Sequence, residues 1–128
     1  MSVVLELPWP PSVNHYWRHV GAKVLISREG RAYRQVVGGI VLAERVAKLE
    51  GRLAVRVMAY PPDKRRRDLD NLLKALLDAL EHAGVYDDDG QIDQLTIERG
   101  HTHKGGKVCM DLVENDAAAV TGNRRGKS

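Results

Sequence analysis

The chain has 128 residues, a length typical of one domain, and its 43% hydrophobic and 29% charged residues predict a globule that folds in water. Phenylalanine is absent and aromatic residues amount to 5%, so the core must be mainly aliphatic. The formal net charge of +3 is too small to establish a nucleic-acid partner by itself. A single cysteine excludes an intrachain disulfide and suits a reducing compartment. The chain has no signal-peptide pattern or apolar run of membrane length, so we expect a cytoplasmic protein with no membrane partner.

The N-terminal segment predicts a strand followed by an extended loop. Apolar side chains alternate with polar ones in this strand, at Val3, Leu5 and Leu7. Three prolines within residues 8–11 exclude a helix there. The aromatic side chains nearby have two interpretations, stacking on exposed bases or closing an edge of the core, and we favour the core. These residues are Trp9, Tyr16 and Trp17.

A short strand at residues 24–26 and a long helix at 28–50 are predicted next. Ser27 is placed to cap this helix and Gly51 to end it. Two adjacent glycines at 38–39 cost about 1 kcal/mol each relative to alanine in a helix. They suggest close backbone packing against the sheet or against a second subunit.

The second half of the chain begins with an alternating strand at 53–59. It leads to a second helix, which starts near Asp68 and stops at Gly84. A strand at about 92–100 is followed by a glycine turn at 104–107. A last alternating strand carries Val108, Met110 and Leu112.

This order, β-β-α-β-α-β-β, predicts one α+β domain over residues 1–114. We expect a mixed β-sheet, two main helices packed on it and a closing antiparallel hairpin. Residues 115–128 are polar and predict a flexible tail.

Charge is concentrated at the start of the second helix. Four consecutive basic residues precede it, namely Lys64, Arg65, Arg66 and Arg67. Leucines between 69 and 80 recur at helical spacing, which places Asp70 and Lys74 on the opposite, polar side. Because two residues of helix turn by about 200°, Asp68 can point to the same spot as Asp70 only if it precedes the helix.

Two interpretations of these acids remain open. In the first, Asp68 caps the helix, Asp70 favours its dipole and the basic run is a solvated loop. In the second, both carboxylates join the acidic group at 87–89 around a divalent cation. The two groups lie at opposite ends of a helix roughly 20 Å long, so the later loop would have to fold back. Carboxylates about 4 Å apart repel by about 4 kcal/mol at an effective dielectric near 20, and oxygen ligands suit Mg²⁺ or Mn²⁺.

These motifs together closely resemble the RusA family of Holliday-junction resolvases. The proline-rich start at 7–17 is followed by Arg-Arg-Asp-Leu-Asp-Asn at 66–71 and by Lys74. Further along the chain, the matching positions are 78–80, 83–84, 88–89 and Gln91. All motifs occur in order, and the match runs from about residue 5 to residue 113.

The resemblance implies a Mg²⁺-dependent endodeoxyribonuclease of bacteria and their prophages, with Mn²⁺ as a substitute. It implies a homodimer that makes paired nicks in four-way DNA junctions during recombination and repair, with no small-molecule cofactor. The alternatives are a catalytically silent DNA-binding protein and a metal nuclease that acts on other branched DNA.

The resemblance also implies roles for individual residues. The catalytic and metal-binding acids would be Asp68, Asp70 and Asp89, and the essential lysine Lys74. The family's third acid lies just before Gln91 with one residue between, which selects Asp89 over its neighbours Asp87 and Asp88. We expect the DNA-binding residues to be Lys64, Arg65, Arg66, Arg67 and Asn71.

Overall fold

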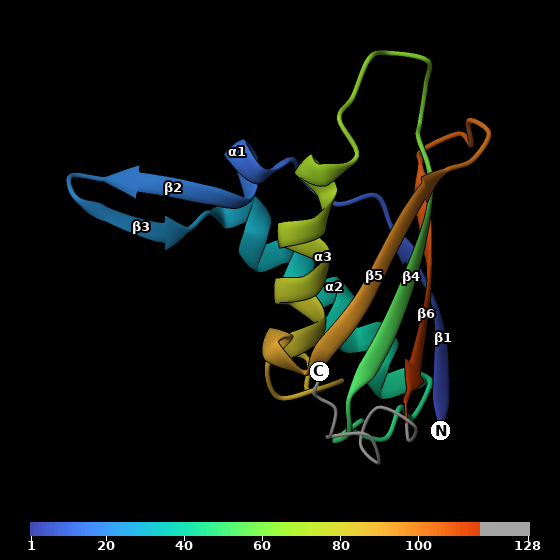
Figure 1. The fold of residues 1–128 in the computed structure, drawn as a ribbon. Helices are drawn as coiled ribbons and strands as arrows, with labels where there is room; N and C mark the ends of the chain where they lie inside the picture. The colour runs from blue at the N-terminus through green and yellow to red at the C-terminus, as the bar shows by residue number, and fades with distance from the viewer. Residues whose placement is uncertain (116–128) are drawn as a thin grey trace.

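The computed structural model describes residues 1–115 (Figure 1). Its elements are β1 (Ser2–Pro8), α1 (Val13–Tyr16), β2 (Trp17–Val20), β3 (Lys23–Ile26), α2 (Arg28–Ala43), β4 (Leu53–Tyr60), α3 (Asp70–His82), the 3₁₀ turn η1 (Asp89–Gln91), β5 (Ile92–Arg99) and β6 (Lys107–Glu114). All but one residue of the predicted tail lies outside the described residues. None of the helices described here combines the length and hydrophobicity needed to cross a bilayer.

Four strands form a mixed sheet in the order β1-β6-β4-β5. Strand β6 runs antiparallel to both β1 and β4, whereas β5 runs parallel to β4. This confirms the α+β class with a mixed sheet. Parallel neighbours need a crossover connection, and α3 supplies it between β4 and β5.

The predicted closing hairpin is wrong, because β4 lies between β5 and β6. The turn does reverse the chain with glycines at positive φ, 81° at Gly105 and 73° at Gly106. Turn chemistry therefore predicted the reversal correctly. It does not decide which strand becomes the neighbour, and here the β-α-β connection places β5 on the far side of β4.

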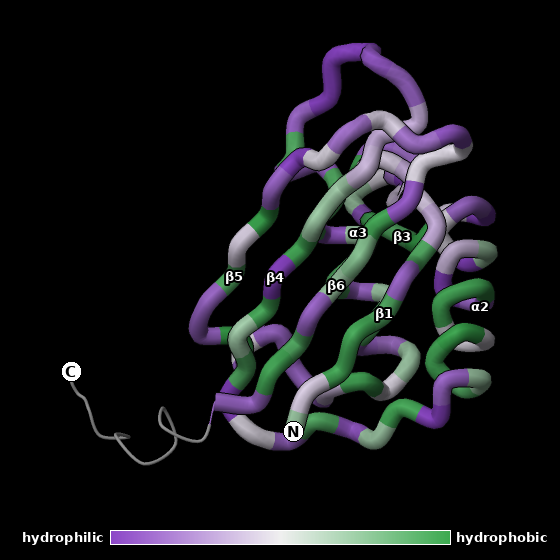
Figure 2. The backbone as a smooth tube through the Cα atoms, turned by 90° about the vertical axis from the view of Figure 1, so that its right-hand side faces the viewer, coloured by the Kyte–Doolittle hydropathy of each residue, from purple (hydrophilic) through white to green (hydrophobic). Residues whose placement is uncertain are grey.

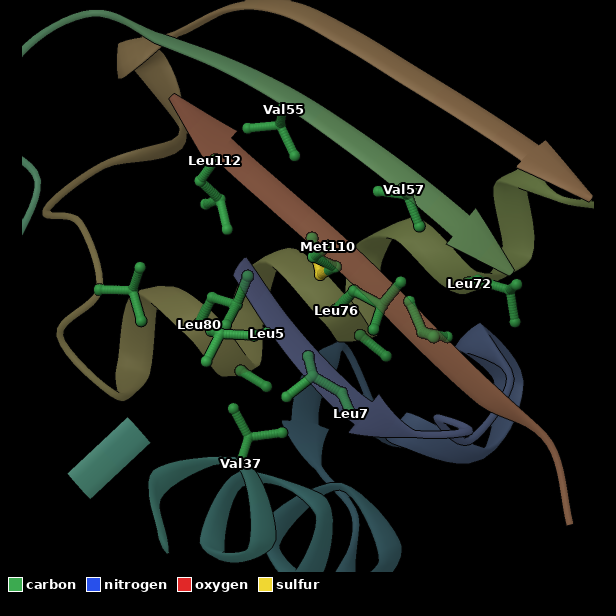
Figure 3. Packing of buried hydrophobic residues seen from close by; sticks show 14 of the residues in the cluster. Leu5, Leu7, Val37, Val55, Val57, Leu72, Leu76, Leu80, Met110 and Leu112 are labelled. Atoms are coloured by element: carbon green, nitrogen blue, oxygen red, sulfur yellow. The ribbon is translucent and has the colours of Figure 1, made fainter. Parts of the chain in front are cut away.

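Helices α2 and α3 pack on one face of the sheet (Figure 1). Hydrophobic and hydrophilic residues alternate along β4 and β6, so each strand turns one side to the helices (Figure 2). Figure 3 shows leucines of α3 meeting side chains of the sheet. The fully buried set is largely aliphatic, as predicted, and includes Leu5, Leu53, Val57, Leu76, Leu80 and Leu112. Burying one such side chain contributes about 1.5–3 kcal/mol.

Helix α2 starts as predicted but ends earlier. The Ser27 side chain accepts a hydrogen bond from the Gly30 N–H, which confirms the cap. The helix stops at Ala43 and not at residue 50, because Arg45 adopts φ +55° and turns the chain back. No glycine marks this reversal. A Cβ added to either glycine at 38–39 would have no neighbour within 4 Å, so packing against the sheet is wrong.

Two short elements at the N-terminal side were not predicted. Helix α1 is a single turn, and β2 pairs antiparallel with β3, the strand expected at residues 24–26. The hairpin formed by residues 17–26, which we call the arm, projects away from the sheet and helices (Figure 1). A strand that buries almost nothing on either face carries no alternating hydrophobic signal.

Candidate active site

The start of α3 presents two acidic side chains to solvent. Asp70 is the first helical residue and Asp68 precedes the helix, as predicted. Leu69 occupies the N-cap position and no side chain caps the helix, so the interpretation of Asp68 as the cap is wrong. Within residues 1–115, neither carboxylate makes a hydrogen bond or an ion pair. Both acids therefore remain free to bind an external cation.

Asp68 lines a hollow of about 370 Å³ between the basic loop and the proline-rich segment. Its other polar lining comes from Ser12, Arg66, Arg67 and Asn71, and Trp9 forms an apolar wall. Residues from two distant parts of the sequence thus meet beside one of the acids. A hollow that combines cations, an amide and a carboxylate has the chemistry to receive a phosphodiester.

The basic loop is organised by Asp63, a residue that the sequence motifs did not single out. Its carboxylate accepts hydrogen bonds from Arg67 Nη1 (2.7 Å) and the Arg65 backbone N–H (2.9 Å). The Arg67 hydrogen bond is the largest effect that lowers the Asp63 pKa to about 2. Arg67 also lies over the Trp9 ring, 5.9 Å from its centroid. An aspartate immediately before a basic run was the signal available for this role.

The four predicted basic residues therefore divide into two pairs. Arg65 and Arg67 form ion pairs with Asp63, at 3.3 Å and 2.7 Å. Lys64 and Arg66 are exposed and make no ion pair in the part of the chain that the structure describes. The full charge of the second pair is therefore available to an external anion.

Lys74 lies one turn after Asp70, on the same side of α3. It is exposed and lines a second hollow, of about 440 Å³, together with Asn14, Trp17, His19 and Val24. Its ammonium group is unpaired within residues 1–115. A free cation one turn from a free carboxylate can reach a phosphate that is bound at that carboxylate.

The predicted polar side of α3 is not uniformly exposed. Asp78 accepts hydrogen bonds from Arg34 Nε (2.8 Å) and Arg34 Nη2 (3.1 Å), and it also accepts the Tyr16 hydroxyl. Tyr16 is fully buried, and burial first, then the bond to Asp78, raises its pKa. Trp17 packs edge-on against it, with centroids 5.0 Å apart. The interpretation as core is confirmed for Tyr16.

The acidic loop after α3 folds back along the helix only part of the way. The Tyr86 hydroxyl lies 2.7 Å from the Leu77 carbonyl oxygen and 2.8 Å from Asp89 Oδ1. The Asp89 N–H donates to Glu81 Oε1 at 3.2 Å. Leu77 is seven residues beyond Asp70, about 10 Å along the axis. Asp89 is therefore held against the C-terminal half of α3.

The three neighbouring acids of this loop have different partners. Asp87 pairs with Lys48 at 2.8 Å, and Asp88 caps η1 by accepting the Gly90 N–H at 2.9 Å. Only Asp89 is turned toward α3, which supports the choice made from the resemblance. Burial first, then the nearby Asp89 charge, raises the pKa of Glu81. Glu81 lies eleven residues after Asp70, which places both on the same side of the helix. This spacing could have identified Glu81 as a further acid on the side of α3 that carries Asp70.

One chain does not assemble the predicted metal site. Among residues 1–115, no three histidine, cysteine, aspartate or glutamate side chains lie together in an arrangement that could hold a metal ion. Asp68 and Asp70 stand at one end of α3, and Asp89 stands with Glu81 toward the other. The donors are of the right kind for a hard cation, but each end alone is incomplete.

Comparison with known proteins agrees with the motifs. Residues 8–111 match the family model described as endodeoxyribonuclease RusA. A crossover junction endodeoxyribonuclease of Enterobacteria phage HK97 is 46% identical over 112 residues, which cover 84% of this chain and 91% of the relative. Its namesake from Escherichia coli K12 is 41% identical over 114 residues, with coverages of 86% and 92%. The relative from Enterobacteria phage 82 is 40% identical over 111 residues, with the same coverages. This chain therefore belongs to the RusA endodeoxyribonuclease family.

Proposed function

We propose that this protein is a crossover junction endodeoxyribonuclease that resolves four-way DNA junctions by paired, metal-dependent phosphodiester hydrolysis. The observation that carries the proposal is a pair of carboxylates, Asp68 and Asp70, beside cations on the basic loop and at Lys74, all without an ion-pair partner within residues 1–115. The names of the relatives agree with this activity. The reaction would serve recombination and repair in the cytoplasm of a bacterium or on behalf of its prophage.

A catalytically silent DNA-binding protein accounts less well for these acids. In that alternative, the carboxylates would be helix caps or ion-pair partners of the arginines. The cap position belongs to Leu69, and the arginines pair with Asp63. Within residues 1–115, Asp68 and Asp70 then have no hydrogen-bond or ion-pair partner, and the only structural role left is the small helix-dipole contribution of Asp70, which favours a catalytic role.

The proposed enzyme is a homodimer whose two copies complete each other's metal site. In a two-fold symmetric dimer, every contact between the two copies occurs twice, with the roles of the copies exchanged. If the start of α3 in one copy meets the acidic loop of its partner, Asp70 and the partner's Asp89 face each other twice. One dimer would then carry two equivalent sites, as paired nicks on two strands require.

In this arrangement Asp68 and Asp70 of one copy and the partner's Asp89 would together hold Mg²⁺, with Mn²⁺ as a substitute. A bound divalent cation supplies an activated water and neutralises charge that develops on the phosphate. The chain's own residues bind and orient the strand. Lys64 and Arg66 hold the backbone on either side of the basic loop, and Asn71 offers its amide within the hollow beside Asp68. Lys74 places a positive charge next to the reacting phosphate.

The substrate class is tested by incubating a four-way junction, a flap and a linear duplex of matched sequence with the protein. Each is assayed with Mg²⁺ and again with Mn²⁺. We expect symmetrical paired nicks in the junction and an intact duplex. Equal cutting of the flap would instead indicate a nuclease for branched DNA in general. Tight junction binding without cutting in either metal would support the silent DNA-binding protein.

A further inference from the structure

The arm, residues 17–26, has the charge of a DNA-binding element although no family motif used above assigns it one. Every residue from 18 to 25 is exposed. The sequence from residue 7 to residue 28 contains no aspartate or glutamate. Arg18 and Lys23 make no ion pair within residues 1–115. The arm is therefore a projecting hairpin whose positive charge nothing in the described chain neutralises.

The base of the arm is fixed firmly to both main helices. The Ser27 hydroxyl donates to the Tyr16 carbonyl oxygen at 2.9 Å and accepts the Gly30 N–H at 2.9 Å. A Cβ on Gly30 would lie 2.5 Å from that carbonyl oxygen, so only glycine lets α2 approach this closely. Tyr16 is in turn bonded to Asp78 of α3. The anchor sets the direction of a hairpin that itself buries almost no surface.

The two faces of the arm have different neighbours. The strand register pairs Arg18 with Leu25, His19 with Val24 and Val20 with Lys23, and successive pairs point to opposite faces. His19 and Val24 share the face that closes the 440 Å³ hollow with Lys74. Arg18 and Lys23 share the other face. The hollow therefore connects the lysine of the candidate active site with one face of the arm, and the two cations lie on the opposite face.

We propose that the arm binds the DNA duplex that lies next to the cut site in the junction. Arg18 and Lys23 would contact the phosphates of that duplex. The inference rests on the proposed function and adds a second contact region to it. A two-stranded ribbon is narrow enough to enter a major groove about 12 Å wide. A contact between the arms of two copies is the less suitable alternative, because the arm offers no acidic residue to pair with these cations. Phosphate contacts position the protein and carry no sequence preference.

The test is the salt dependence of junction binding, measured without divalent cations for the Arg18→Ala/Lys23→Ala variant. Because two phosphates are then no longer neutralised, the log–log slope should become shallower by about 1.8 and Kd at 0.1 M salt should rise by at least about tenfold. The matched control is Lys48→Ala/Arg56→Ala, which removes two charges from exposed ion pairs outside the arm. Its slope should equal that of the wild type.

Two results would overturn the proposal. One is an unchanged slope in the arm variant, and the other is a change in its oligomeric state by sedimentation, which would make the arm an interface between copies. Far-ultraviolet circular dichroism confirms folding, and Arg18→Gln/Lys23→Gln replaces the alanine variant if that fails to fold. A wild-type protein that binds junctions but never cuts them would defeat the proposed function and leave the slope comparison intact.

Discussion

Replacing Asp70 by Asn should abolish junction cutting and leave junction binding intact. The change keeps the shape of the side chain and removes the negative charge that a divalent cation requires. We expect the single-turnover rate to fall at least about a thousandfold, equivalent to about 4 kcal/mol of barrier. Asp70 has no partner among the described residues, so the fold loses only a helix-dipole contribution of about 0.5 kcal/mol.

The matched control for this variant is Asp111→Asn. Asp111 is an exposed carboxylate on β6 and lies in the sheet, away from α3. The Asp111→Asn variant should cut junctions at the wild-type rate. A rate for Asp70→Asn within tenfold of the wild type would remove Asp70 from the catalytic site. Loss of binding together with cutting would show that Asp70 has a structural role.

Neutralising Lys64 and Arg66 together should weaken junction binding about a hundredfold at 0.1 M salt, about tenfold for each phosphate that is no longer neutralised. Both side chains are exposed, and neither is engaged by a carboxylate within residues 1–115. Arg65→Ala in the same loop is the comparison, because its charge is already partly offset by Asp63. We expect less than about a threefold loss for it. Titration of a fluorescent junction without divalent cations measures both.

Equal losses per residue changed in the two variants would mean that the loop acts only through its total charge. The division of the basic residues by Asp63 would then be wrong. The loss of net charge alone cannot explain a larger loss of binding for Lys64 and Arg66 than for Arg65, because every one of these substitutions removes one positive charge.

Local patterns in the sequence predicted the elements whose signals lie within a few residues. The alternation in β4, the Ser27 cap and Gly84, with φ +84° after α3, are of this kind. The early end of α2 was missed because Arg45 takes a left-handed conformation without being glycine. The position of β5 was missed because strand order depends on packing between segments that are distant in sequence.

The candidate site divides in the same way. The spacing of Asp68, Asp70 and Lys74 placed them correctly at the start of α3, because helical geometry alone determines it. The role of Asp63 and the anchoring of Asp89 by Tyr86 depend on tertiary contacts. Spacing could not show that one chain keeps its acids at two ends of a helix, and this arrangement is the reason to infer a shared site.

Whether two copies complete one metal site is tested most directly by a purified mixed dimer. One subunit carries Asp70→Asn and the other Asp89→Asn, and different affinity tags select the pair. If the partner supplies the third acid, one site of this dimer contains both changes and the other contains neither. The two parent variants should be inactive, and the mixed dimer should nick junctions once, at about half the wild-type rate of first cutting. A mixed dimer as inactive as its parents would contradict the shared site.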